Sequence, residues 1–395
     1  MGAIGCLKSY TIKVDNVILY EAYKGLKYEI ERIHRTPDYA GYQLLSLNDY
    51  SGQGSAIVGV LNVFFREKGY CDAKDFTQFC SPLVPLAKFP KFTFKNTEEA
   101  SVEIAVSNYT GDQVVGKQAT YKITDSKGND VRHGVIGMGG SIPVGYSDID
   151  EIALPLGDIH QAEQLTLTVS ISGHSNQWEF WVYPDEKQEL EAEVGILITD
   201  TLDSKAMKVL EKGGKVLICA PGKISYGKDI VQHYLPVFWN TSWFKMRPPH
   251  TTGAYIDSSH PVFHDFPTDD FSNLNWWELL NNAQVMQLTD FPKSFHPIVQ
   301  SIDTWFVSRK IGMLFEANVL NGKLMMTSMD LSSQLDRRIV ARQLRRSIIN
   351  YMKSDAFQPS CTVEPERISD LFTKIAPPVD MFTKDSPDEL KPKIN

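Results

Sequence analysis

The spacing of apolar residues predicts different secondary structures along the chain. In residues 26–33 apolar side chains recur at helical spacing, and Pro37 ends that pattern. An apolar run over residues 42–47 then leads through polar residues and glycines into a second apolar segment, residues 56–65. We predict a helix, a strand, a loop and a second helix in that order.

Between about residues 87 and 184 the pattern changes to alternation of apolar and polar positions. Residues 101–106 and 165–171 alternate, and a β-branched run over residues 120–124 lies between them. Strands at this spacing without helical stretches predict a β-sandwich of immunoglobulin-like type.

One face of the last strand of this region is strongly apolar. Trp178, Phe180 and Val182 share that face, which we predict to pack in the core, and Trp181 lies on the other.

A third region begins near residue 193 with a strand, helix and strand pattern. Residues 194–198 and 215–219 are apolar, and a helical segment, residues 204–212, lies between them. This order predicts parallel strands joined by a crossover helix. Asn321-Gly322 predicts a hairpin, and residues 337–353 predict a closing helix. The region is typical of an open α/β sheet.

Composition is that of an ordinary globular protein. The 395 residues are 42% hydrophobic and 22% charged, with a formal charge of -8. No basic face is evident to neutralise phosphates, so we expect no nucleic-acid partner. The arginines from Arg337 to Arg346 lie between the apolar residues of a helical pattern. We interpret them as a solvated helix face.

The sequence indicates no metal, cofactor, membrane span or secretion signal. The five cysteines are widely spaced, without a Cys-x-x-Cys pair, which predicts free, mostly buried thiols. No apolar run reaches the length of a membrane helix, and the first residues lack the features of a signal peptide. We expect a cytoplasmic location for the chain as written.

The first candidate site is the loop that follows the predicted strand of residues 42–47. In a β/α enzyme such loops meet the substrate, because strand ends point side chains into the mouth of the sheet or barrel. Asn48, Asp49, Tyr50 and Gln53 are therefore candidate substrate-binding residues.

The same stretch resembles the last β/α unit of the catalytic barrel in family 2 glycoside hydrolases of the β-galactosidase-like, multidomain bacterial type. Gly41-Tyr42-Gln43-Leu44-Leu45 matches the family's strand, and Asp49-Tyr50-Ser51-Gly52-Gln53-Gly54 matches its loop. Further blocks follow in the family's order, including Val182-Tyr183-Pro184, Phe238-Trp239-Asn240-Thr241 and Leu314-Phe315-Glu316-Ala317. The resemblance covers most of the chain from about Lys24 onward.

The resemblance implies an organisation into four parts. Residues 1–86 are expected to be a remnant of the C-terminal end of a TIM-type barrel, and residues 87–184 the immunoglobulin-like sandwich. Residues 185–357 are expected to be a flavodoxin- or amidotransferase-like α/β domain. Residues 358–395 are expected to be a mostly disordered tail, with a short helix around Ile368 to Lys374.

The resemblance also implies hydrolysis of β-linked terminal sugars, in the cytoplasm as written or in the periplasm or outside the cell for a full-length parent. In the family both catalytic carboxylates come from barrel strands that precede the matched segment. We therefore expect no catalytic residue and no cofactor here. A carbohydrate is the expected ligand, and the expected partner is the missing barrel portion or a second copy bound through residues 1–86. Glu21 is a disfavoured catalytic candidate.

A tryptophan-rich window supports an alternative function. Trp239, Trp243, Trp276, Trp277 and Trp305 lie among polar residues. Aromatic faces beside polar groups suit sugars, but they also pack domains together. We predict a packing role for Trp277 and leave Trp243 open between packing and sugar contact. The alternative function is a non-catalytic carbohydrate-binding or assembly module.

Cys219 is a weak candidate for an amidotransferase nucleophile. It ends a predicted strand, but Ala220-Pro221-Gly222 follows it and no nucleophile-elbow motif surrounds it. We expect no catalysis at this position.

Overall fold

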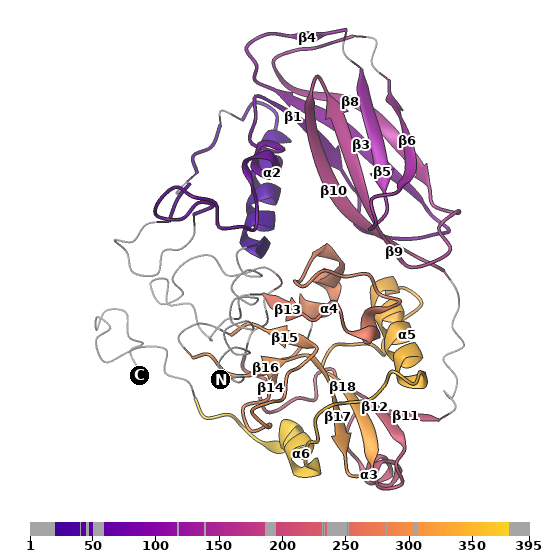
Figure 1. Cartoon of the computed structure of the whole chain (residues 1–395). Helices are drawn as coiled ribbons and strands as arrows, with labels where there is room; N and C mark the ends of the chain where they lie inside the picture. The colour runs from indigo at the N-terminus through magenta and orange to yellow at the C-terminus, as the bar shows by residue number, and fades with distance from the viewer. Residues whose placement is uncertain are drawn as a thin grey trace. The chain divides into compact units, whose positions relative to one another are not determined.

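The computed structural model divides the chain into two compact units, residues 22–186 and residues 187–395 together with residues 1–21. It describes residues 20–39, 41–44, 47–49, 59–116, 118–137, 140–185, 195–230, 232, 234, 251, 253–281, 283–303 and 307–378. Figure 1 shows the helices and strands of the two units.

The unit of residues 22–186 contains two larger sheets. The first has the order β1-β3-β8, with β1 Leu83–Lys88, β3 Glu99–Asn108 and β8 Gly145–Pro155. The second has the order β2-β10-β9-β5-β6, with β2 Thr93–Lys95, β10 His174–Tyr183, β9 Glu163–Ile171, β5 Ala119–Thr124 and β6 Asp130–Ile136. A small pair joins β4 Val114–Val115 to β7 Ser141–Ile142. Among the pairings of the named strands of this unit, β2 with β10 is parallel and the others are antiparallel.

Both larger sheets contribute to one hydrophobic core. Val102 and Leu154 enter it from the first sheet, and Leu167 enters it from the second. Trp178 and Phe180 belong to the same core, so the predicted apolar face of this strand is confirmed. Trp181 is also fully buried, but it lies outside this cluster, as expected for the opposite face.

A helix packs on the sandwich through buried charged groups. Residues 22–34 of this unit are helical, in agreement with the predicted first helix. The Glu31 carboxylate is fully buried and binds Lys27 Nζ at 3.0 Å and Arg35 at 2.7 Å. On β10, the side chains of Asn176 and Trp178 donate to the same carboxylate at 2.8 and 2.9 Å. Because each Glu31 oxygen accepts from two groups, the cost of burying the charge is offset.

The segment predicted as strand, loop and helix differs from that prediction. Residues 41–44 belong to no strand, and residues 59–65 form turns rather than a helix. Among the described residues of this segment, pairing is limited to isolated bridges of Leu61 with Asn48 and Glu67. A barrel strand needs hydrogen-bonding neighbours on both sides, and the described residues supply none for residues 41–44. Residues 50–58 lie outside the described part of the chain.

Short helix α2, Ala73–Thr77, begins directly after Asp72. The Asp72 side chain accepts from the Asp75 backbone, and the Asp75 side chain accepts from the Asp72 backbone, which forms a reciprocal cap.

The other unit is built on a mixed six-stranded sheet of order β11-β12-β18-β17-β15-β13. Its strands are β11 Ile196–Thr199, β12 Lys215–Cys219, β18 Gly322–Thr327, β17 Leu314–Val319, β15 Val299–Ser301 and β13 Ala254–Ile256. Strands β11, β12 and β18 are mutually parallel, so the predicted parallel unit is confirmed. Strands β17 and β18 pair antiparallel around Asn321, which confirms the hairpin.

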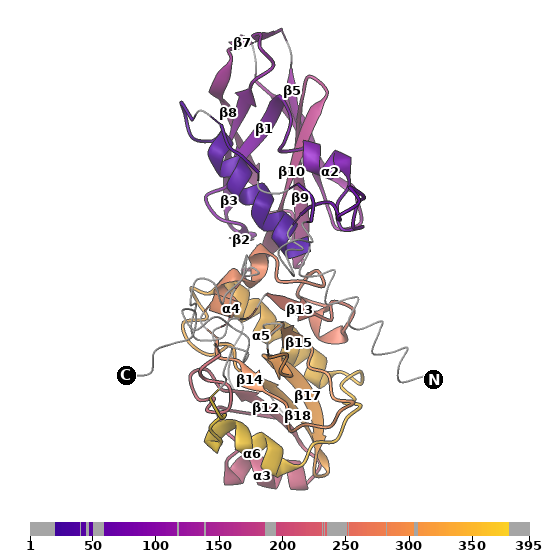
Figure 2. The same ribbon diagram turned by 90° about the vertical axis from the view of Figure 1, so that its left-hand side faces the viewer.

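Helices cover this sheet. Helix α3, Ser204–Glu211, and helix α6, Pro365–Thr373, contribute to one core and lie side by side (Figure 2). The remaining elements are α5 Ile339–Lys353, α4 Trp277–Asn281, the 3-10 turns Pro261–Phe263 and Leu274–Trp276, and the pair β14 Met286–Gln287 with β16 Ile311–Gly312. Since Ile368 and Leu371 on α6 are fully buried, packed chain extends beyond residue 357.

Two predictions for this unit are wrong. Arg342 and Arg345 on α5 are buried, with 9% and 8% of their surface exposed, so the arginines do not share one solvated face. Trp277 is 57% exposed, whereas its neighbour Trp276 is fully buried. A 3-10 turn ends at Trp276 and α4 begins at Trp277, and this change of helix type shifts which side chain faces inward.

Taken together, the described residues form a mixed, mostly β fold with several sheets and without a closed barrel. No helix in the described part of the chain is long and apolar enough to span a membrane.

Candidate functional site

Two of the five predicted binding residues fall within the described structure. Asn48 is half-buried, and Asp49 is 8% exposed. Tyr50, Gln53 and Trp243 lie outside the described residues, so their proposed sugar contacts remain predictions.

The Asp49 carboxylate binds two residues that follow it in the chain, Gly59 and Lys68. Lys68 Nζ donates to Asp49 Oδ1 at 2.6 Å, and the Gly59 backbone N–H donates to the same oxygen at 3.0 Å. The Asp49 N–H in turn donates to the Leu61 carbonyl at 2.9 Å. The carboxylate therefore brings Asp49, Gly59 and Lys68 together.

Gly59 makes this close approach possible. A Cβ atom on Gly59 would overlap the backbone of Asn48 and Asp49. The Tyr70 hydroxyl donates to the Val60 carbonyl at 3.3 Å from the same side of the segment. Burial of Tyr70 and the negative charges nearby, including Asp49, raise its pKa, so the phenol stays protonated.

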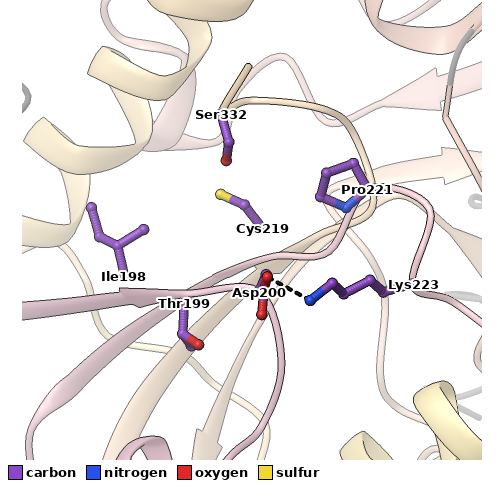
Figure 3. Close-up of a pocket in the computed structure, with 7 residues that line it drawn as sticks. All are labelled: Ile198, Thr199, Asp200, Cys219, Pro221, Lys223 and Ser332. Atoms are coloured by element: carbon purple, nitrogen blue, oxygen red, sulfur yellow. Dashed lines mark hydrogen bonds and ion pairs between the residues drawn. The ribbon is translucent and has the colours of Figure 1, made fainter.

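A pocket of about 440 Å³ lies at the carboxyl ends of the parallel strands in the other unit. The seven lining residues are Ile198, Thr199, Asp200, Cys219, Pro221, Lys223 and Ser332 (Figure 3). They come from the ends of β11 and β12 and from the loop after β18. Ligands of open α/β sheets bind at this edge, because strand ends and their loops leave a crevice there.

Charged and hydroxyl groups mix with apolar ones in this pocket. Lys223 Nζ donates to Asp200 at 2.5 Å across the mouth, and both side chains are about half exposed. Figure 3 shows the Cys219 thiol directed toward the Ser332 side chain. Such a mixture suits a small polar ligand.

Cys219 does not have the properties of a nucleophile. Burial raises the pKa of its thiol to about 11, although the Arg345 charge and a Ser332 hydrogen bond oppose the rise. A catalytic cysteine requires a thiolate near neutral pH and a base beside it. No histidine is among the described residues that line the pocket.

Glu21 is buried in the same unit as the pocket but away from it. The Ser272 N–H donates to Glu21 Oε1 at 2.9 Å, and the Ser272 hydroxyl binds the same oxygen. Complete burial raises the pKa of the carboxyl well above its ordinary value, against the opposing hydrogen bonds. A Cβ atom on Gly253 would overlap this carboxyl group, so the group is tightly enclosed. Glu21 is therefore a buried carboxyl group, tightly packed inside the unit.

The two described tryptophans of the aromatic window have different environments. Trp276 Nε1 donates to Thr268 Oγ1 at 2.7 Å, and its ring packs edge-on against Phe263 and Phe266. Trp277 presents more than half of its surface to solvent. Of this pair, Trp277 is the one available to a ligand.

Comparisons with known proteins identify domains without an assigned role. Residues 98–184 match a family described as a domain of unknown function (DUF8488), and residues 197–373 match another such family (DUF8487). No curated protein matches the chain.

Solved structures give only distant similarities. An alkylpurine DNA glycosylase, AlkC of Pseudomonas fluorescens, is 13% identical over 26% of this chain and 31% of its own, with a TM-score of 0.22. A CARDB domain from Pyrococcus furiosus is 11% identical over 26% of this chain and 93% of its own, with a TM-score of 0.20. The apo-form Calx CBD1 domain is 13% identical over 26% of this chain and 98% of its own, with a TM-score of 0.19. Such low scores do not establish a shared fold.

Sequence reasoning did not identify the pocket at the edge of the α/β sheet. A signal was present, because Asp200 and Cys219 lie at the ends of two predicted parallel strands. Lys223 and Ser332 had no comparable signal, since the loops that bring them to the pocket follow no periodic pattern.

Proposed function

We propose that the chain from about Lys24 onward is the C-terminal part of a family 2 glycoside hydrolase, β-galactosidase-like, that acts on β-linked terminal sugars. The structural observation that best supports the proposal is that the Asp49 carboxylate binds both Gly59 and Lys68, and so brings residues 49 and 59 together. A binding loop must be preorganised to hold a ligand, and anchored ends provide that. The order of matching sequence blocks supports the same assignment.

The finer fold assignments follow from this proposal. Residues 1–86 are the end of a catalytic barrel, a role supported by the sequence resemblance alone, because the described residues 41–44 form no strand. The two-sheet unit is an immunoglobulin-like sandwich, supported by its shared core. The mixed sheet is a flavodoxin- or amidotransferase-like domain, supported by its three parallel strands and flanking helices.

In this function the loop binds the sugar and does not break the glycosidic bond. Asn48, Tyr50 and Gln53 hold the terminal sugar by hydrogen bonds and stacking, while Asp49 orients them. The acid/base and nucleophilic carboxylates belong to the preceding barrel strands of the family. The 395-residue chain alone is therefore expected to release no nitrophenol from nitrophenyl β-galactoside, β-glucoside or β-glucuronide.

A second candidate function is a carbohydrate-binding or assembly module. The exposed indole of Trp277 favours it, because an exposed aromatic ring can stack on a sugar face. The two functions differ in where the sugar binds.

Binding measurements on the full chain test both functions. Lactose, cellobiose and methyl β-glucuronide are titrated by saturation-transfer NMR against wild type, Asn48→Ala and Trp277→Ala. The proposal predicts weaker binding in Asn48→Ala only. Gln113→Ala serves as the control, because Gln113 is exposed and belongs to neither candidate site. Loss of sugar binding in Trp277→Ala alone supports the second function. Binding at the wild-type level by both Asn48→Ala and Trp277→Ala contradicts both proposed functions.

A further inference from the structure

Arg345 on α5 is a buried cation without a carboxylate partner among the residues that the structure describes. The side chain is 8% exposed, and its Nη1 atom donates a hydrogen bond to the Leu331 carbonyl at 2.9 Å. Its Nε atom is buried and has no hydrogen-bond partner. By contrast, Arg309 forms a bidentate pair with Asp303.

A buried charge without a counterion is energetically unfavourable, because water has been removed and no opposite charge replaces it. Natural proteins pair such groups or use them to bind ligands. Arg345 therefore identifies its surroundings as a place where an anion would be stabilised.

The pocket at the sheet edge lies directly beside this cation. Arg345 bonds the carbonyl of Leu331, and the next residue, Ser332, lines the pocket. Its charge also acts on the thiol of Cys219, another lining residue. The α5 guanidinium thus lies behind the wall that Cys219 and Ser332 form.

The mouth of the pocket supplies a second cation. Lys223 is paired there with Asp200, but both side chains are about half exposed, and such pairs contribute little stability. Lys223 can therefore turn from Asp200 to a bound anion at small cost. The hydroxyl group of Ser332 provides a further donor.

We propose that this pocket binds a small ligand through an oxyanion, a phosphate or carboxylate group, which contacts Lys223 and the Ser332 hydroxyl and is stabilised by the charge of Arg345 behind the wall. The ligand fits a crevice of about 440 Å³, which accommodates a small metabolite and not a polymer. This site is separate from the Asn48 loop, and the proposal does not depend on the glycosidase assignment.

Methyl NMR of the full chain tests the site. Isoleucine methyl groups are labelled, because Ile198 lines the pocket and Ile256 on β13 lies at the opposite edge of the same sheet. Inorganic phosphate and acetate are titrated separately, with chloride adjusted to hold the ionic strength constant. We expect a saturable shift of Ile198 with at least one anion and none at Ile256. Saturation by phosphate alone assigns a phosphoryl ligand, and saturation by acetate alone assigns a carboxylate.

Three variants establish which side chains bind. Lys223→Gln removes a charged hydrogen bond to the anion and Arg345→Met removes the charge behind the wall, so the apparent affinity should fall about tenfold or more in each. Lys228→Gln is the matched control, because Lys228 is exposed and does not line the pocket. If Arg345→Met does not fold, the anion affinity of Lys223→Gln alone tests the proposal. No saturable Ile198 shift with either anion, or wild-type affinity in Lys223→Gln or folded Arg345→Met, would overturn the proposal.

Discussion

The Trp178 indole on β10 donates to the buried carboxylate of Glu31 at 2.9 Å, and this bond joins the helix of residues 22–34 to the sandwich. The same carboxylate binds Lys27 and Arg35. The helix is thus held by a group that has no access to solvent, so its position depends on every member of the cluster.

Replacing Glu31 should destabilise the unit of residues 22–186 strongly. Glu31→Ala leaves Lys27 buried without its counterion, and breaking such a pair from one side costs about 3 to 5 kcal/mol. Urea unfolding followed by tryptophan fluorescence measures the change. Glu29→Ala is the control, because Glu29 lies on the exposed face of the same helix. A loss no larger than that of the control would contradict the proposed anchoring.

The buried Glu21 carboxyl predicts a pH dependence. Its pKa is raised by burial from an ordinary value of 4.5, so the folded chain holds a proton that the unfolded chain releases. Its contribution to stability is therefore complete below about pH 4.5 and is lost as the pH rises toward the folded pKa.

Glu21→Gln removes this proton linkage. The free energy of unfolding, measured in urea between pH 4 and 8, should fall less with rising pH in Glu21→Gln than in wild type. Glu211→Gln, at an exposed position, should keep the wild-type slope. Parallel profiles for Glu21→Gln and wild type would show that the carboxyl is not protonated in the folded chain.

Truncation of the two adjacent tryptophans should change the stability of the protein to very different extents. Trp276→Ala removes a fully buried ring and is expected to cost about 3 to 5 kcal/mol. Trp277→Ala removes a largely exposed ring, and its effect should stay within about 0.5 kcal/mol. Thermal melts of the two variants compare them directly, and equal losses would contradict the assigned burial.

Limited proteolysis should first cut between Thr36 and Tyr70. The described residues of this segment have few regular hydrogen bonds and expose Tyr42, Phe64 and Phe65, whereas the preceding helix is anchored by Glu31. Mass spectrometry of the first fragments identifies the sites. First cuts within the mixed sheet, residues 254–327, would contradict the expected order of stability.

The sequence predicted the elements whose pattern is local or pairs with a neighbour in the chain. Strands β11 and β12 follow from apolar runs on both sides of a helix, and the inward face of β10 follows from alternation at Trp178 and Phe180. Both patterns are read directly because the periodicity of each segment is local, although residues distant in sequence bury them.

Features that depend on distant partners could not be predicted. The run at residues 42–47 has strand composition, but the described chain offers residues 41–44 no strand to pair with. The burial of Arg345 depends on the loop after β18, and no periodic pattern in the sequence predicts the position of that loop. The Asp49 ion pair likewise required Lys68 to return across a turn that replaced the predicted helix.

The most direct test of the account is to find where a sugar binds on the full chain. A β-galactoside carrying a photoreactive diazirine is cross-linked to the protein, and the labelled peptides are identified by mass spectrometry with and without excess lactose. The account predicts lactose-sensitive labelling within residues 47–59, and loss of that labelling in Asn48→Ala. Lactose-sensitive labelling at the peptide that contains Trp277, with none in residues 47–59, would contradict it.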